Sequence, residues 1–193
     1  MKTLYYRRHS IKDGPNNTIG PEGLELAQSE GEHAGNIGEE YYWMFHGPLI
    51  RTAQTALAFL SGLALGSRTL TLIPIPMPII EEIGTDELFA KIGTPECHAA
   101  VKSGMSNLMA TLTTHPDVVG EFITTAMAGV KKMFSMIDDG PPSIAFGHSP
   151  MIELAAYGID KSQYTLGELE GLVFIQDDNG DIAVARKIST SKG

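Results

Sequence analysis

The chain has 193 residues, a formal net charge of −9 and a hydrophobic fraction of 42%. These values are ordinary for one globular domain, and they exclude a disordered or fibrous protein. Because an acidic surface repels nucleic acid and anionic lipid, we expect neither as a partner. A single cysteine, Cys97, excludes an internal disulfide. No secretory signal and no apolar run of ~20 residues is present, so we expect a cytoplasmic protein forming one domain over residues 1–193.

The first half of the chain alternates between strand and helix patterns. Residues 3–6 favour a strand, and a loop rich in Gly, Pro and Asn follows it. Pro21 then opens a helix, because proline is suited to the first helical turn. Further along we expect a strand at 41–45, a helix at 49–60, a strand at 69–73 and a short-helical or irregular stretch at 81–93.

The second half begins with two predicted helices, 95–112 and 116–137, each of which starts at a proline. They are followed by a predicted strand at 143–146, a helix at 149–157 and a hairpin with strands at 169–175 and 182–188. This order predicts an α/β fold, a three-layer α/β/α sandwich with a mostly parallel central sheet. We expect residues 93–137 to form a helical cap over the site.

Arg and His side chains stand at the ends of three predicted strands. The first strand runs into Arg8 and His9, the second is followed by Arg51, and the strand at 143–146 runs into His148. Ligands of α/β folds bind at the carboxyl ends of the strands. Each residue alone has an ordinary structural explanation, but together they predict one site.

This residue set suits phosphoryl transfer. A phosphoryl group carries spread negative charge, and its transfer depends mainly on positioning and charge stabilisation. Arginine offers fixed forks to the phosphoryl oxygens, and a neutral imidazole is a competent nucleophile near pH 7. A second histidine can donate to those oxygens, and a carboxylic acid can protonate the leaving group. This chemistry requires no metal and no cofactor.

The sequence resembles the histidine phosphatase superfamily, also called phosphoglycerate mutase-like. The family opens with Arg-His-Gly at the end of the first strand, where this chain has Arg8-His9-Ser10. A second motif is similar to Ser-Pro-Leu-x-Arg-Thr-x-Gln-Thr-Ala, which residues 47–56 follow except at the first position. The last motif, a strand that ends in His, matches His148. The order of the motifs agrees over nearly the whole chain.

The resemblance implies roles for these residues. His9 would be the nucleophile that forms a phosphohistidine, while Arg8, Arg51 and His148 would hold the phosphate. The family's general acid lies in a Pro-x-Leu-x-Glu pattern, which residues 78–82 match if Glu82 is the acid. Glu81 is an alternative, and both acids can also be solvated residues at a helix start. Asn16 is a further candidate for a phosphate contact.

The predicted function is a metal-independent phosphatase that acts on a phosphomonoester through a phosphohistidine. The substrate would be a phosphorylated small molecule or a phosphoprotein. Within the same fold, a protein-phosphohistidine phosphatase or a phosphoglycerate mutase is an alternative. A non-catalytic phosphate-binding module is the alternative from a different class. The sequence contains no pattern that identifies the substrate or the oligomeric state.

Overall fold

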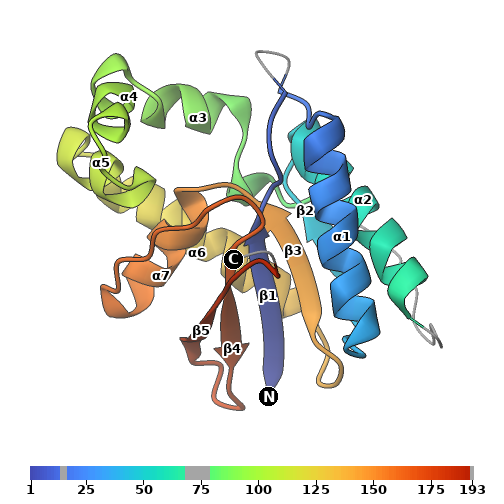
Figure 1. The fold of residues 1–193 in the computed structure, drawn as a ribbon. Coiled ribbons are helices and arrows are strands. Elements are labelled where there is room, and N and C mark those ends of the chain that lie inside the picture. The colour runs from blue at the N-terminus through green and yellow to red at the C-terminus, as the bar shows by residue number, and fades with distance from the viewer. Residues whose placement is uncertain (14–16, 68–78, 192–193) are drawn as a thin grey trace.

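The computed structural model describes residues 1–13, 17–67 and 79–191. These residues form a five-stranded sheet with helices on both faces (Figure 1). The strands are β1 (Lys2–Arg8), β2 (Met44–His46), β3 (Ser143–Gly147), β4 (Gly171–Gln176) and β5 (Ile182–Ile188). The helices are α1 (Pro21–Asn36), α2 (Ile50–Gly66), a short 3₁₀ turn η2 (Glu81–Ile83), α3 (Asp86–Ile92), α4 (Pro95–Lys102), α5 (Asn107–Thr114), α6 (Val119–Met136) and α7 (Met151–Asp160). The strand predicted at 69–73 lies outside the described residues.

The sheet has the strand order β2-β3-β1-β4-β5. β1 and β2 both pair with β3 in parallel, whereas the pairs β1–β4 and β4–β5 are antiparallel. Two antiparallel steps return β5 to the direction of β1, so four of the five described strands run the same way. The predicted α/β fold with a mostly parallel sheet is confirmed, and so is the hairpin of β4 and β5.

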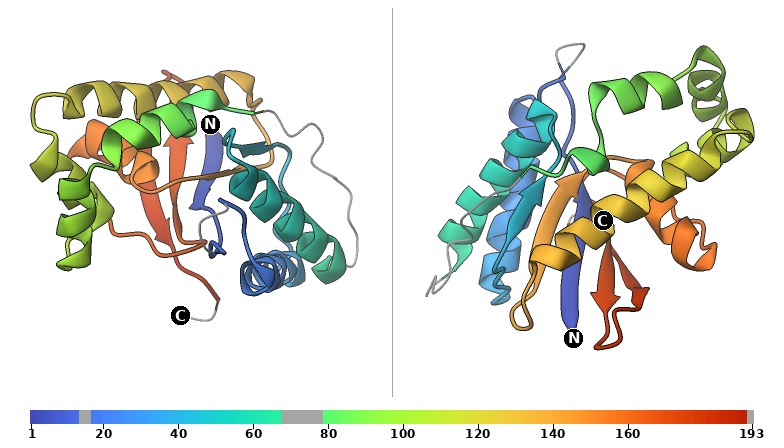
Figure 2. Two further views of the ribbon diagram at one scale, coloured as in Figure 1. Left: turned by 90° about the horizontal axis from the view of Figure 1, so that it is seen from above. Right: turned by 180° about the vertical axis from the view of Figure 1, so that it is seen from behind.

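Alternating side chains divide the core into two layers, because successive residues of a strand point to opposite faces. In β3, Ile144 and Phe146 pack with α1 and α2, whereas Ala145 packs on the opposite side with α6 and α7. In β1, Leu4 and Tyr6 also face α6 and α7. Figure 2 shows the same sandwich from above and from behind.

Helices α1 and α2 pack closely through glycines. A Cβ atom on Gly62 would lie 1.8 Å from the carbonyl oxygen of Gln28, and one on Gly31 would lie 2.0 Å from that of Phe59. No heavy atom can occupy those positions, so the two backbones come together only because side chains are missing there. This contact fixes α2, whose first turn carries Arg51.

The helix predicted at 95–112 is wrong, because two shorter helices take its place. Gly104 has a φ of +102°, which ends the helical path after α4. The Ser106 side chain then accepts a hydrogen bond from the Met109 backbone N–H and starts α5. The Met- and Ala-rich pattern of this stretch contains no strong indication of the break other than Gly104 itself.

Three short helices, α3, α4 and α5, stand beyond the carboxyl ends of β1 and β3 (Figure 1). We call them the cap helices. Within the predicted cap range of 93–137, α6 packs instead against the sheet, burying Phe122, Val130 and Phe134 in its core. None of the described helices has the length and apolar character needed to cross a bilayer.

Candidate active site

His9 and His148 meet because their strands are neighbours in parallel register. Arg8 pairs with Gly147, and the His9 backbone N–H donates a hydrogen bond of 2.9 Å to the Gly147 carbonyl. Each of these two strands is therefore followed by a histidine just past the same edge of the sheet. The two imidazole centroids are 4.9 Å apart with an angle of 62° between the rings.

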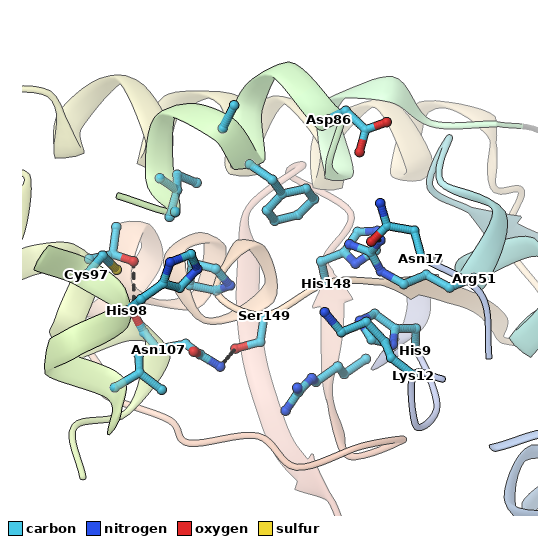
Figure 3. A pocket seen from close by; sticks show the side chains of 18 residues that line it. His9, Lys12, Asn17, Arg51, Asp86, Cys97, His98, Asn107, His148 and Ser149 are labelled. Carbon is cyan, nitrogen blue, oxygen red and sulfur yellow. Dashed lines mark hydrogen bonds between the residues drawn. The ribbon is translucent and has the colours of Figure 1, made fainter. Parts of the chain in front are cut away.

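A cavity of about 440 Å³ opens above these rings (Figure 3). Arg8 and Arg51 line it with the two histidines, so the structure brings together four of the side chains predicted from the strand ends. Arg8 also donates to the Leu166 carbonyl at 2.8 Å and forms an ion pair with Glu168. These contacts hold one guanidinium group in place at the side of the cavity.

Arg51 approaches from the first turn of α2. Its side chain is buried, and its Nη1 donates to the Asn17 Oδ1 at 3.1 Å, whereas its Nε has no hydrogen-bond partner among the described residues. Asn16 lies outside the described residues, but its neighbour Asn17 lines the cavity. Lys12, from the same loop, adds a third cationic side chain.

Burial lowers the pKa of His9 to about 3, with smaller contributions from the charges of Arg51, Arg8 and Lys12. The ring is therefore neutral at pH 7. Its Nδ1 lies 2.6 Å from the Ser10 carbonyl oxygen, which can only accept a hydrogen bond. The proton thus belongs on Nδ1, and Nε2 keeps the lone pair that a nucleophile needs.

His148 is almost completely buried, and neither of its ring nitrogens has a hydrogen-bond partner among the described residues. Burial lowers its pKa well below the usual value, and His9 and Arg51 lower it further. A buried polar group without a partner costs folding free energy. Such a group at the floor of a cavity indicates a site that is completed by a ligand.

The structure places Glu81 and Glu82 elsewhere. Both line a separate hollow of about 300 Å³, and the Lys132 Nζ donates to both carboxylate oxygens of Glu82 at 3.0 Å. Gly84, with a φ of +134°, then turns the chain back toward the site. As a result Asp86, rather than either glutamate, lines the cavity with the histidines.

Asp86 was not predicted from the sequence. It starts α3 one residue after Thr85, whose side chain accepts a hydrogen bond from the Leu88 N–H. An acid in the first turn of a helix is common, because it complements the helix dipole. The only local indication of another role was its place just after the Gly84 turn.

The cavity extends away from the histidines beneath the cap helices. The centroid of the Phe89 ring lies 4.7 Å from that of His148. Phe89 therefore separates the part of the cavity around the histidines from the part beneath the cap helices. Beyond it the lining residues are mostly apolar and come from the three cap helices and from Gly93 between two of them: Ala90, Ile92, Gly93, Cys97, His98, Val101, Asn107 and Thr111. Figure 3 shows Cys97, His98 and Asn107 on this side of the cavity. In the described part of the chain, no three His, Cys, Asp or Glu side chains are grouped as a metal ion would require.

The sequence matches no protein-family model and no curated protein. Solved structures do share its fold. Phosphoserine phosphatase from Entamoeba histolytica is 14% identical, with 99% of this chain and 98% of that chain covered and a TM-score of 0.63. Phosphoglycerate mutase from Bacillus anthracis is 16% identical, with coverage of 95% and 91% and a TM-score of 0.64. The protein histidine phosphatase SixA is 11% identical, with 98% of both chains covered and a TM-score of 0.60. The described backbone thus shares its fold with these three solved structures, as the resemblance of the motifs implied.

Proposed function

We propose that this protein is a phosphatase that hydrolyses a phosphomonoester through a phosphohistidine on His9. The observation that carries the proposal is the placement of a neutral His9 4.9 Å from His148 in a cavity that Arg8 and Arg51 also line. The similar structures support it, since their names describe a phosphoserine phosphatase, a phosphoglycerate mutase and a protein histidine phosphatase.

In the first step, the Nε2 lone pair of His9 attacks phosphorus, and the bond from phosphorus to the leaving oxygen breaks. The imidazole becomes positively charged as the new P–N bond forms. The Ser10 carbonyl that accepts from Nδ1 stabilises this charge. Arg8 and Arg51 neutralise the phosphoryl oxygens, and His148 donates a hydrogen bond to one of them.

The leaving oxygen needs a proton, which an acid in the cavity supplies. The family resemblance implies Glu82, with Glu81 as the alternative. The geometry favours Asp86, because it lines the cavity while the Glu82 carboxylate is held by Lys132. We therefore propose Asp86 as the acid.

In the second step, a water molecule replaces the alcohol. Asp86, now a carboxylate, takes a proton from the water, whose oxygen attacks phosphorus as the P–N bond breaks. Inorganic phosphate leaves, and the electron pair of that bond returns to Nε2. The enzyme is then ready for another cycle, with no net change in its protonation.

The test is hydrolysis of p-nitrophenyl phosphate by the wild type and by His9→Ala. We expect turnover in the wild type and none above the blank in His9→Ala. His33→Ala, which changes an exposed histidine on α1, should keep full activity. An alkaline quench followed by mass spectrometry should locate the phosphoryl group on His9. Turnover that survives in His9→Ala would refute the mechanism, as would tungstate binding without turnover in the wild type.

A matched pair of variants decides the acid. With phenyl phosphate, whose leaving group is poor, Asp86→Asn should lower kcat by about 10²-fold or more. The loss should be smaller with p-nitrophenyl phosphate, because its leaving group needs less protonation. Glu82→Gln should retain activity with both. The opposite pattern would assign the acid to Glu82.

A further inference from the structure

The part of the cavity beneath the cap helices is lined by other kinds of side chain than the part around the histidines. We call it the leaving-group arm and define it by the side chains of six residues: Phe89, Ile92, Cys97, His98, Val101 and Asn107. In a bound phosphomonoester the phosphate lies at the histidines. The alcohol part would then extend into this arm, which lies on the side of His98 and Asn107 in Figure 3.

Charge divides the cavity into two regions. All the cations among its described lining residues, Arg8, Lys12 and Arg51, stand at the phosphate end. The leaving-group arm contains no Lys or Arg among its described residues, and the acidic Asp86 lies on the side of Asn17 and Arg51 (Figure 3). A second anionic group in the substrate would therefore lose hydration without gaining the fixed charge of a Lys or Arg.

The walls of the arm are mostly apolar, but one side of it, next to Ser149, carries a fixed hydrogen-bond acceptor. Asn107 Nδ2 donates to the Ser149 Oγ at 3.0 Å, and Ser149 Oγ in turn donates to the buried Glu153 at 2.5 Å. These contacts orient the amide and leave Asn107 Oδ1 without a partner among the described residues. His98, from α4, also lines the arm and adds a second polar side chain.

From these observations we propose the substrate class. The substrate is a small phosphomonoester whose alcohol part is uncharged, has an apolar or aromatic body, and carries a hydrogen-bond donor. The cavity of about 440 Å³ is the size of a small-molecule site. Phosphorylated carboxylic acids are selected against, because the arm has no cation for the carboxylate. This inference rests on the proposed phosphatase function and adds selection for the alcohol part of the substrate.

The test compares two substrates of nearly the same shape, 4-carbamoylphenyl phosphate and 4-carboxyphenyl phosphate. The first ends in a neutral amide with N–H donors, and the second ends in a carboxylate. We expect kcat/KM for the amide to exceed that for the carboxylate by at least about tenfold. Asn107→Leu, which removes the acceptor, should abolish the advantage of the amide over phenyl phosphate.

A charge added to the arm should invert the selection. Val101, on α4, is half-buried in the arm, and Val101→Arg should raise kcat/KM for the carboxylate substrate relative to the amide. Thr113→Arg adds the same charge at an exposed position of α5 outside the arm and should leave the ratio unchanged.

The possible outcomes separate the two proposals. If no aryl phosphate is hydrolysed, the proposed function fails. If both substrates are hydrolysed equally and Val101→Arg does not alter their ratio, the phosphatase stands and the substrate class is refuted. A wild-type preference for the carboxylate would refute it as well.

Discussion

The free energy of unfolding of this protein should depend on pH through the buried carboxyl group of Glu153. This α7 residue is 1% exposed, and burial raises its pKa from 4.5 to about 7. Ser149 Oγ donates to its Oε1, while its Oε2 has no partner among the described residues. The folded protein therefore binds a proton at Glu153 more tightly than the unfolded chain does.

The size and sign of the effect follow from this difference in pKa. Between pH 4.5 and about 7 the folded state holds the proton and the unfolded state does not, so this contribution to stability falls as the pH rises. It is fully present below pH 4.5 and lost above about 7. Because one pKa unit corresponds to about 1.4 kcal/mol, the loss over this window is about 3 kcal/mol. Glu153→Gln keeps an acceptor for Ser149 but cannot ionise, so it should not lose this stability.

The assay is urea-induced unfolding of the wild type and Glu153→Gln at pH 5, 6, 7 and 8. The free energy of unfolding of the variant minus that of the wild type should grow by about 2.5 kcal/mol across this range, mostly between pH 5 and 7. Comparing the two proteins at each pH cancels the other groups that titrate. Glu25→Gln, at an exposed position of α1, should show no such trend. A difference that stays constant with pH would refute the assignment of a buried, protonated carboxyl.

Two further predictions concern the helix packing and the nucleophile. Gly62→Ala should lower the free energy of unfolding by about 2 kcal/mol or more, because its Cβ would lie 1.8 Å from the Gln28 carbonyl oxygen. Gly120→Ala in α6, where nothing lies within 4 Å of the added Cβ, should be neutral or stabilise by up to about 1 kcal/mol in the same urea titration. The His9 ring should stay neutral from pH 7 down to about 4, since its pKa is about 3. Imidazole ¹⁵N NMR of the ligand-free protein checks this, and a titration of His9 near pH 6 would contradict it.

The sequence was sufficient to predict the parts of the site that follow strands directly. Arg8, His9 and His148 lie at the ends of short β-favouring runs, and parallel pairing necessarily brings such ends to one edge of the sheet. Arg51 lies in the first turn of a helix that begins just after β2. The positions of these residues depend on local secondary structure and on the rule that parallel strands end at the same edge of a sheet. Both can be predicted from the sequence.

The remaining parts of the site depend on the path of the chain between elements. Whether Glu82 or Asp86 reaches the histidines is decided by the turn at Gly84, and no periodic pattern records the direction of that turn. The break at Gly104 likewise creates α4 and α5 from a stretch whose Met and Ala residues favour a helix. The arm of the cavity that these helices form could therefore not be derived from sequence periodicity.

The distribution of charge connects the two proposals. A protein with a net charge of −9 repels anions at long range, so a phosphorylated substrate must gain its affinity from cations at short range. Arg8 and Arg51 supply that attraction only over the histidines, and the nitrogens of His148, which have no partner among the described residues, favour a ligand that accepts hydrogen bonds there. Because the leaving-group arm has no such cation among its described residues, the same electrostatics that hold one anionic group disfavour a second. A substrate with one phosphate and an uncharged body is the kind that satisfies both ends of this cavity.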